Sequence, residues 1–197
     1  MKKTNNKIRK TIQKDLLSIS VPLLTKAGFV RLNRRLLFYR ERSHVIDIFE
    51  MRMSRPGYNT SYRSGRNSFE IEIGVFFKAA PHPMGAKKKG ILGLPVDSVA
   101  GCHFRTRSRP NLFLRDGIHS SLWRTKPWKL LKKPVLNDVE SKMKTFFLPW
   151  FDKFDDLDRV RQYLAQKLNP DEINVEGNKR SAESWGYLYT GSLLQYL

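Results

Sequence analysis

Residues 69–77 form the segment that most constrains the fold, because large apolar side chains recur there at every second position. A β-strand has a period of two residues, so this pattern places one face in a core and leaves the other partly wet. The core face would carry Phe69, Ile71, Ile73, Val75 and Phe77, and the other face Glu70, Glu72, Gly74 and Phe76. The segment therefore predicts a strand in a sheet whose two faces differ in polarity.

Three further segments favour strands of the same sheet. Residues 36–42 and 45–53 are rich in apolar residues and lie so close in the chain that they predict a hairpin. Residues 101–109 predict a fourth strand. Proline, glycine and polar residues predict irregular structure in three stretches, 54–67, 79–100 and 111–134.

Helices are predicted on both sides of the strand-rich region. Residues 11–26 carry apolar side chains at helical spacing, Pro22 is expected to kink or end that helix, and Gly28 to stop it. The predicted helix starts in the last third are a capping box of Asn137 and Glu140, then Asp156, then a weaker segment at 181–197. The sequence thus predicts an α+β fold with an N-terminal helix, an antiparallel sheet of about four or more strands, and C-terminal helices packed on or beside it.

Positive charge is concentrated in the first two thirds of the chain. The net charge is +19, yet residues 1–135 hold 29 Lys or Arg against 8 Asp or Glu, and residues 136–197 hold 8 against 10. We therefore predict a basic α+β domain at 1–135 and a helical C-terminal extension at 136–197, packed on the same domain. Such an excess repels itself unless a counter-charge is near, and a polyanion or an acidic protein would supply one.

Cysteine usage and hydropathy bear on location. Cys102 is the single cysteine, so the chain cannot form an internal disulfide and gives no sign of an oxidising compartment. No stretch approaches the roughly 18 apolar residues of a membrane helix. We expect a cytoplasmic protein with no membrane partner.

Several short motifs follow one another in a recognisable order. They are Ala27-Gly28-Phe29, Leu37-Phe38-Tyr39-Arg40, residues 45–49, residues 69–75 and Cys102-His103-Phe104-Arg105. This order resembles a bacterial family catalogued as domain of unknown function 4304, over about residues 11–123. The chain departs from the family at Glu50, where the family tends to have Gln, and its loops at 54–67 and 79–100 look enlarged. The resemblance implies a compact α+β fold and no established activity.

A row of basic residues in the fourth predicted strand is the strongest local signal of function. His103, Arg105, Arg107 and Arg109 would project from one strand face at about 7 Å spacing, which suits the phosphates of a nucleic-acid strand. The alternative is that Glu70 and Glu72 on a neighbouring strand balance these charges. The strand order, which the sequence does not reveal, decides between the two.

The following stretch combines cations with aromatic rings. Its cations are Arg115, Arg124, Lys126, Lys129, Lys132 and Lys133. Its rings are Phe113, Trp123 and Trp128, and such a mixture suits single-stranded nucleic acid. Burial of Trp123 and Trp128 in the core is the favoured interpretation over base stacking. Lys87, Lys88 and Lys89 could also touch phosphates, although a solvated lysine loop is favoured there because no phosphate-loop pattern is present.

Signals for catalysis are weak. Asp47, Glu50, Glu70 and Glu72 lie on predicted strands and could hold Mg²⁺ in a nuclease, but charge pairing across strands is the favoured alternative. Cys102 and His103 are adjacent in a strand and point to opposite faces, so they cannot form a nucleophilic pair. We predict no metal, no cofactor and no catalytic residue.

Two functions remain open from the sequence. The first is a non-catalytic nucleic-acid-binding protein of bacterial or phage origin, acting through the basic strand and the basic-aromatic stretch, with a larger assembly as one setting. The second is a protein-interaction module, such as an inhibitor, an immunity protein or a complex subunit, that binds an acidic partner.

Overall fold

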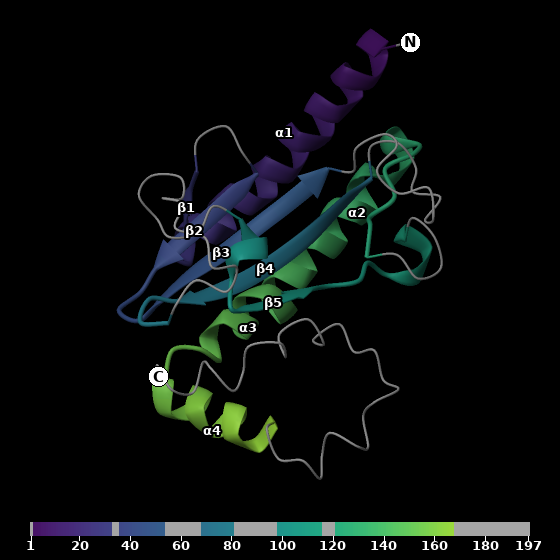
Figure 1. The fold of residues 1–197 in the computed structure, drawn as a ribbon. Helices are drawn as coiled ribbons and strands as arrows, with labels where there is room; N and C mark the ends of the chain where they lie inside the picture. The colour runs from purple at the N-terminus through teal and green to yellow at the C-terminus, as the bar shows by residue number, and fades with distance from the viewer. Residues whose placement is uncertain (1, 33–35, 54–67, 81–97, 116–120, 168–197) are drawn as a thin grey trace.

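The computed structural model describes residues 2–32, 36–53, 68–80, 98–115 and 121–167, with the backbone alone at 2–6 and 163–167. Its elements combine helices at both ends with a central sheet (Figure 1). In chain order they are α1 (Lys2–Lys26), β1 (Val30–Arg31), β2 (Leu37–Glu41), β3 (Val45–Met53), β4 (Phe69–Phe77), the turn η2 (Val99–Gly101), β5 (Phe104–Arg107), the turn η3 (Leu112–Leu114), α2 (Trp128–Lys142), the π-helical segment η4 (Met143–Phe147), α3 (Leu148–Asp152) and α4 (Leu157–Lys167).

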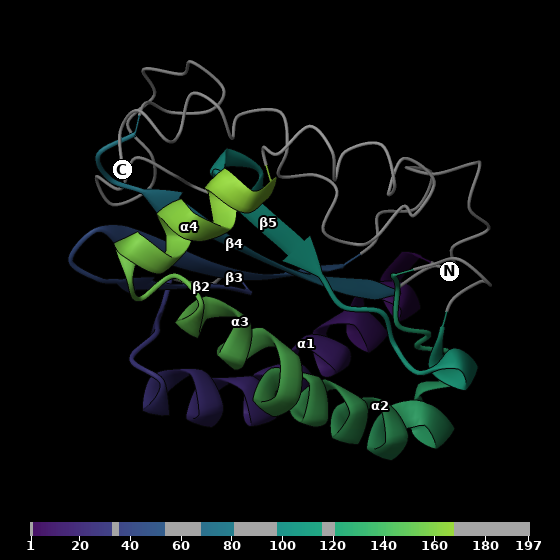
Figure 2. The same ribbon diagram turned by 90° about the horizontal axis from the view of Figure 1, so that it is seen from below.

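The sheet is a five-stranded meander in the order β1-β2-β3-β4-β5, and every pair is antiparallel. Its longest pairing joins β3 to β4 from Val45↔Phe77 to Met53↔Phe69. Helices α1, α2 and α3 cover one face of this sheet (Figure 2). The predicted α+β fold is therefore confirmed, with an N-terminal helix, an antiparallel sheet and C-terminal helices.

The two faces of the sheet differ in the way that the alternation at β4 predicted. On the helix-covered face, side chains such as Phe49 and Ile73 join a large core with α1, α2 and α3. The second face, which is turned away from those helices, carries a smaller apolar cluster that includes Ile48, Phe76 and Val99. Burial of the helix-covered face supplies the main hydrophobic stabilisation, because apolar area removed from water is the dominant favourable term in folding.

Helix α1 begins earlier than the sequence predicted and ends at Lys26, as predicted. It starts at Lys2, and Pro22 lies inside it without ending it. Pro22 is exposed and stands in the last turn, where the missing N–H removes one hydrogen bond and costs little beside the burial of Leu24. Gly28 ends the helix as predicted, with a φ of +83° that favours glycine.

Helix α2 is the largest departure from the predicted elements. It begins at Trp128, so Asn137 is an exposed residue in its interior and the predicted capping box is wrong. Pro134 within the segment argued against a helix, because proline lacks the N–H of a helical hydrogen bond. The burial of Val135 and Val139 against the core offsets the loss of that bond. The expected boundary after residue 135 falls inside α2, and residues on both sides of it share one core.

The remaining predictions have mixed outcomes. Strand β5 is shorter than predicted, and β1 was not predicted. Asp156 caps α4 as expected, since its Oδ1 accepts hydrogen bonds from the backbone N–H groups of Asp158 and Arg159. The loop predicted at 54–67, most of the one predicted at 79–100 and the helix predicted at 181–197 lie outside the described residues. In the part of the chain that the structure describes, no helix has the length and hydropathy to span a membrane.

Candidate nucleic-acid interface

The four residues expected to form a basic row on β5 do not form one. His103 precedes the strand and is only 5% exposed, and its Nδ1 accepts a hydrogen bond from the Phe77 backbone N–H at 3.0 Å. Arg109 lies beyond the end of β5 and is exposed, whereas Arg105 and Arg107 are half-buried. The expected arrangement as one row is therefore wrong, because β5 has only four residues and the imidazole of His103 packs against the rings of Phe76 and Phe77. Contact of the arginines with phosphate stays a prediction.

Arg107 instead belongs to an ionic network on the second face of the sheet. The network consists of Glu50, Arg52, Glu70, Glu72 and Arg107. Arg52 contacts Glu50 at 3.0 Å and Glu72 at 2.9 Å, and the Arg107 Nη1 atom lies 3.7 Å from Glu70 Oε2. The register brings these side chains together, since Glu72 stands opposite both Glu50 and Arg107. Charge pairing across strands, the alternative to phosphate binding, thus holds for Arg107.

The network also bears on the nuclease hypothesis. Asp47 does not belong to it, because this carboxylate is buried on the helix-covered face between Arg40 and Arg42. The other three carboxylates share the second face with Arg52, and the Coulombic effect of an arginine opposes the binding of a cation there. Among the described residues, no group of His, Cys, Asp and Glu side chains is arranged to hold a metal ion.

Burial changes the titration of Glu70, which belongs to the network. It raises the pKa of Glu70 above its usual 4.5, and the neighbouring Glu72 raises this pKa further, while Arg107 and Arg52 act in the opposite direction. The Glu70 carboxylate also accepts a hydrogen bond from Ser121 Oγ at 3.4 Å. The network is thus a partly desolvated set of charges, held by strand register, with a net excess of one carboxylate.

The two tryptophans of the basic-aromatic stretch are anchors of the fold, as the favoured interpretation had it. Trp123 is fully buried and stacks on Phe69 with ring centroids 5.2 Å apart, and its Nε1 donates to Asp138 Oδ2 at 2.9 Å. Trp128 is half-buried, and its Nε1 donates to Asp15 Oδ2 on α1, also at 2.9 Å. The ring of Trp123 is therefore not free to stack on a base, and that of Trp128 is only partly exposed.

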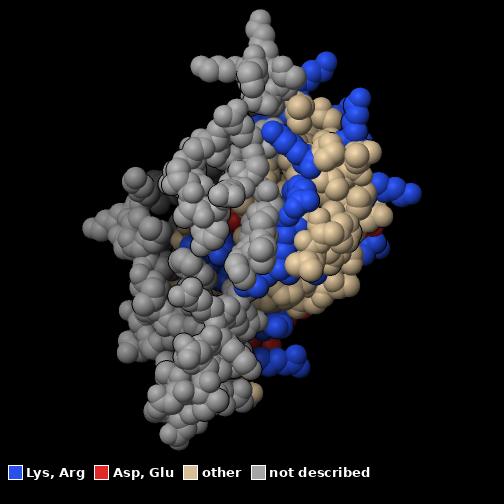
Figure 3. Space-filling model, turned by 90° about the vertical axis from the view of Figure 1, so that its right-hand side faces the viewer, with Lys and Arg blue, Asp and Glu red and all other residues tan. Residues whose placement is uncertain are grey.

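The cations of the same stretch have a different environment from its tryptophans. Five of them are exposed and form no ion pair with another described residue. We call these five the basic surface, and they are Arg109, Arg124, Lys126, Lys129 and Lys133. Lys132 is also exposed but pairs with Asp15 at 2.9 Å, and Arg115 is half-buried with its Nε donating to the Pro110 carbonyl. Figure 3 shows Lys and Arg side chains gathered on the side of the molecule where the chain passes from β5 to α2.

Between Arg109 and the other members of the basic surface, the chain forms a turn that exposes apolar side chains. In η3, Leu112 is 73% and Phe113 64% exposed, while Leu114 is fully buried in the core. Leu130 on α2 is a third exposed apolar residue, at 76%. This region therefore combines cations that form no ion pair with a described residue and apolar groups that contact solvent.

Two acidic residues that position this region were not singled out from the sequence. Asp138 lies buried within α2 and accepts from both Trp123 Nε1 and the Asn111 backbone N–H. Asp15 holds the start of α2 through Trp128 and Lys132. A signal for Asp138 was present, because a carboxylate between Val135 and Val139 interrupts the apolar stripe of a helix, and buried carboxylates require partners.

Cys102 and Lys87 to Lys89 are the remaining residues singled out from the sequence. Cys102 is a small buried residue as predicted, and burial raises the pKa of its thiol well above the usual value. It packs so closely on β4 that a Cβ at Gly74 would lie 2.7 Å from the Cys102 Sγ. Lys87, Lys88 and Lys89 lie outside the described residues.

Comparison with known proteins adds no relative to this picture. No family model, no curated protein and no solved structure matches the chain. The resemblance to domain of unknown function 4304 therefore stays a prediction, and functional inference for this chain rests on its own residues.

Proposed function

We propose that the chain is a non-catalytic nucleic-acid-binding protein that contacts its ligand through the basic surface. One observation carries the proposal. Residues 105–137 of the sequence include nine Lys or Arg residues and one carboxylate, Asp116. Five of those cations are exposed and form no ion pair with a described carboxylate.

Unpaired cations are the groups that a polyanion can use at lowest cost. A paired arginine such as Arg107 must give up a carboxylate before it binds a phosphate, whereas Lys129 and Lys133 give up only water and counterions. Phosphate contacts of this kind supply affinity without reading sequence, so the proposed binding is general in sequence and sensitive to salt. The cytoplasmic location expected from the sequence belongs to the same proposal, since nucleic acids are found chiefly inside cells.

The salt dependence of binding tests the proposal. With five phosphate contacts, the association constant for a mixed-sequence 20-mer should fall about 100-fold for a single strand and about 500-fold for a duplex between 50 and 200 mM NaCl. Fluorescence anisotropy with a labelled oligonucleotide measures both values. The absence of binding to single and double strands at 50 mM NaCl would refute the proposal.

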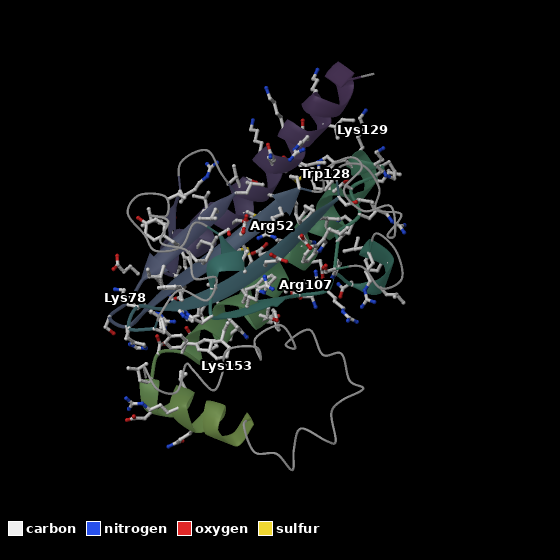
Figure 4. The ribbon with its side chains drawn as sticks, in the orientation of Figure 1. Arg52, Lys78, Arg107, Trp128, Lys129 and Lys153 are labelled. Atoms are coloured by element: carbon white, nitrogen blue, oxygen red, sulfur yellow. The ribbon has the colours of Figure 1, made fainter. Side chains whose placement is uncertain are left out.

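A matched pair of variants separates this surface from general positive charge. Lys129→Ala with Lys133→Ala removes two cations of the basic surface and should lower the slope of log affinity against log salt by about 1.5. Lys78→Ala with Lys153→Ala removes the same charge, and Figure 4 shows these two lysines at the opposite end of the molecule from Lys129. Equal losses of affinity in the two variants would contradict a localised binding surface.

A protein-interaction module is the second candidate, and the exposed apolar side chains favour it. Leu112 and Leu130 are more than 70% exposed among cations, and interfaces with acidic partners combine such apolar contacts with a charged rim. This candidate predicts that an acidic protein co-purifies with the chain in stoichiometric amount and is lost on the substitution Leu130→Ser. Nucleic-acid binding, in contrast, should be unchanged in that variant.

A further inference from the structure

Phe113 is the one large aromatic side chain that is exposed among the described residues. It is 64% exposed, and its neighbour Leu112 is 73% exposed. Single exposed apolar residues are common on protein surfaces, but two adjacent ones within a basic stretch are not explained by the fold. The other rings of this stretch, Trp123 and Trp128, are held by Asp138 and Asp15.

The turn that carries Phe113 is fixed on both sides. Before it, the Asn111 backbone N–H donates to Asp138 Oδ2 at 3.3 Å. After it, the Arg124 backbone N–H donates to the Leu114 carbonyl at 2.7 Å, and the side chain of Leu114 is fully buried. The backbone of η3 is therefore tied to both α2 and the core, and ordering this turn would add little to the entropic cost of binding.

Arginines occupy the positions around the same turn. Arg109 and Arg115 flank it in the chain, and the hydrogen bond to Leu114 brings the backbone of Arg124 beside it. Arginine suits such a place because its planar guanidinium binds phosphate in a bidentate manner and stacks on flat groups. An exposed ring with arginines before and after it in the chain can contact a base while these cations bind the flanking phosphates.

We propose that Phe113 stacks on an unpaired base, and that single-stranded nucleic acid is accordingly the preferred ligand of the basic surface. This inference rests on the proposed function and specifies its ligand. A duplex hides the faces of its bases within the helical stack, whereas a single strand offers them to aromatic side chains. The cations then follow the backbone of the strand, and the ring supplies a contact that salt does not screen.

The test compares one labelled 15-nucleotide strand with its duplex at 50 mM NaCl. Phe113→Ala should weaken single-strand binding about tenfold or more, as expected for the loss of one stacked base, and change duplex binding less than twofold. The salt slope should stay the same, because the ring carries no charge. Leu112→Ala is the matched control at the adjacent exposed site and should change single-strand binding less than about threefold.

Two further variants separate stacking from apolar contact. Phe113→Leu keeps an apolar side chain and should lose nearly as much affinity as Phe113→Ala, while Phe113→Trp should keep the affinity. The indole in Phe113→Trp should also lose fluorescence on adding the single strand, beyond any change in the unsubstituted protein. Circular dichroism confirms that each variant is folded.

The outcomes distinguish the two proposals. Equal affinity for both ligands, with no loss in Phe113→Ala, overturns the stacking role and leaves the basic surface as a general polyanion site. No binding of either ligand at low salt overturns the proposed function and the stacking role together. Binding of an acidic protein that Phe113→Ala abolishes, without binding of oligonucleotides, would assign the exposed ring to the second candidate function.

Discussion

Phe113 and Trp123 lie ten residues apart in one basic stretch and have opposite environments. Trp123 stands opposite Phe69 in an isolated bridge, so its indole stacks on a core ring with an interplanar angle of 4°. Its N–H is satisfied by Asp138, which a buried indole requires. Phe113 is exposed and has neither kind of partner among the described residues. Composition alone does not predict which of the two rings is buried. Their burial differs because Trp123 pairs with Phe69 and bonds to Asp138.

Glu70 gives a prediction for the pH dependence of stability. Burial and Glu72 raise its pKa in the folded protein above 4.5, so the folded state holds this proton more tightly than the unfolded chain. Its stabilising effect is thus complete below the unfolded pKa and is lost as the pH rises through the folded pKa. Glu70→Gln removes this titration. The free energy of unfolding of the variant, relative to that of the wild type, should therefore increase from pH 4 to pH 7.

Urea unfolding of both proteins at pH 4, 5.5 and 7 measures this difference. The matched substitution Glu140→Gln controls for the effect of the amide, because Glu140 is a more exposed carboxylate on α2 that pairs with Lys144 of η4. If the free energies of unfolding of Glu70→Gln and the wild type change in parallel from pH 4 to pH 7, the pKa of Glu70 is not raised in the folded protein.

At the level of elements, the sequence predicted the strands better than the helices. Strands β3 and β4 begin and end where they were expected, because an apolar segment bounded by polar residues has one stable placement in a half-buried sheet. Helix α2 was placed nine residues too late, since Pro134 suggests a break and only tertiary burial overrides it.

The candidate site was predictable in composition but not in arrangement. Period two correctly placed Arg105 and Arg107 on one strand face. The same rule says nothing about the neighbouring strand, and the pairing of Arg107 with Glu70 depends on β4 lying beside β5. In the basic-aromatic stretch, the tryptophans pack on the fold and most of the cations are exposed. The sequence could not predict this division with certainty, because contacts with residues distant in the chain decide which side chains are buried.

Asp15 links α1 to α2 through its side-chain carboxylate. Asp15 accepts from Trp128 Nε1 and from Lys132 Nζ, both at 2.9 Å, and so ties the first two turns of α2 to α1. Asp15→Ala should lower the free energy of unfolding by about 1–2 kcal/mol, the value of hydrogen bonds to a charged group at a partly exposed site. Hydrogen exchange should become faster at the backbone amides near the start of α2.

Asp15→Asn and Asp152→Ala are the controls for this prediction. Asn keeps an acceptor for the indole and should cost less than Ala. Asp152 is an exposed carboxylate on α3 without an ion pair among the described residues, so its removal should leave exchange in α2 unchanged. Unchanged exchange in Asp15→Ala as well would mean that apolar packing alone holds the start of α2.

Over the whole molecule, charge is distributed unevenly relative to the sheet. The ionic network on the second face brings together both signs. The stretch from Arg109 to Lys133, beyond β5, has Asp116 as its single carboxylate, and Figure 3 shows few acidic side chains among the described residues on that side. Like charges held close together repel, so the surface that would attract a polyanion also opposes folding in the absence of one.

This conflict between binding and stability predicts the sign of a substitution. The four exposed cations Arg124, Lys126, Lys129 and Lys133 can be replaced together by Ala. Because their mutual repulsion then disappears, the Tm at 20 mM NaCl should rise by a few degrees, which corresponds to about 1 kcal/mol for a chain of this size. The increase in Tm between 20 and 300 mM NaCl should shrink in the variant, since less repulsion is left for salt to screen.

Four cations elsewhere provide a control of equal charge. Each of them has a carboxylate partner, and they are Lys78, Lys144, Arg159 and Arg161. Their joint replacement by Ala removes attraction together with charge, so it should raise the Tm less than the first variant or lower it. Scanning calorimetry at the two salt concentrations compares both variants with the wild type. A fall in Tm for the first variant would mean that the four cations of the basic surface stabilise the fold. Their presence would then be explained without the binding of an external anion.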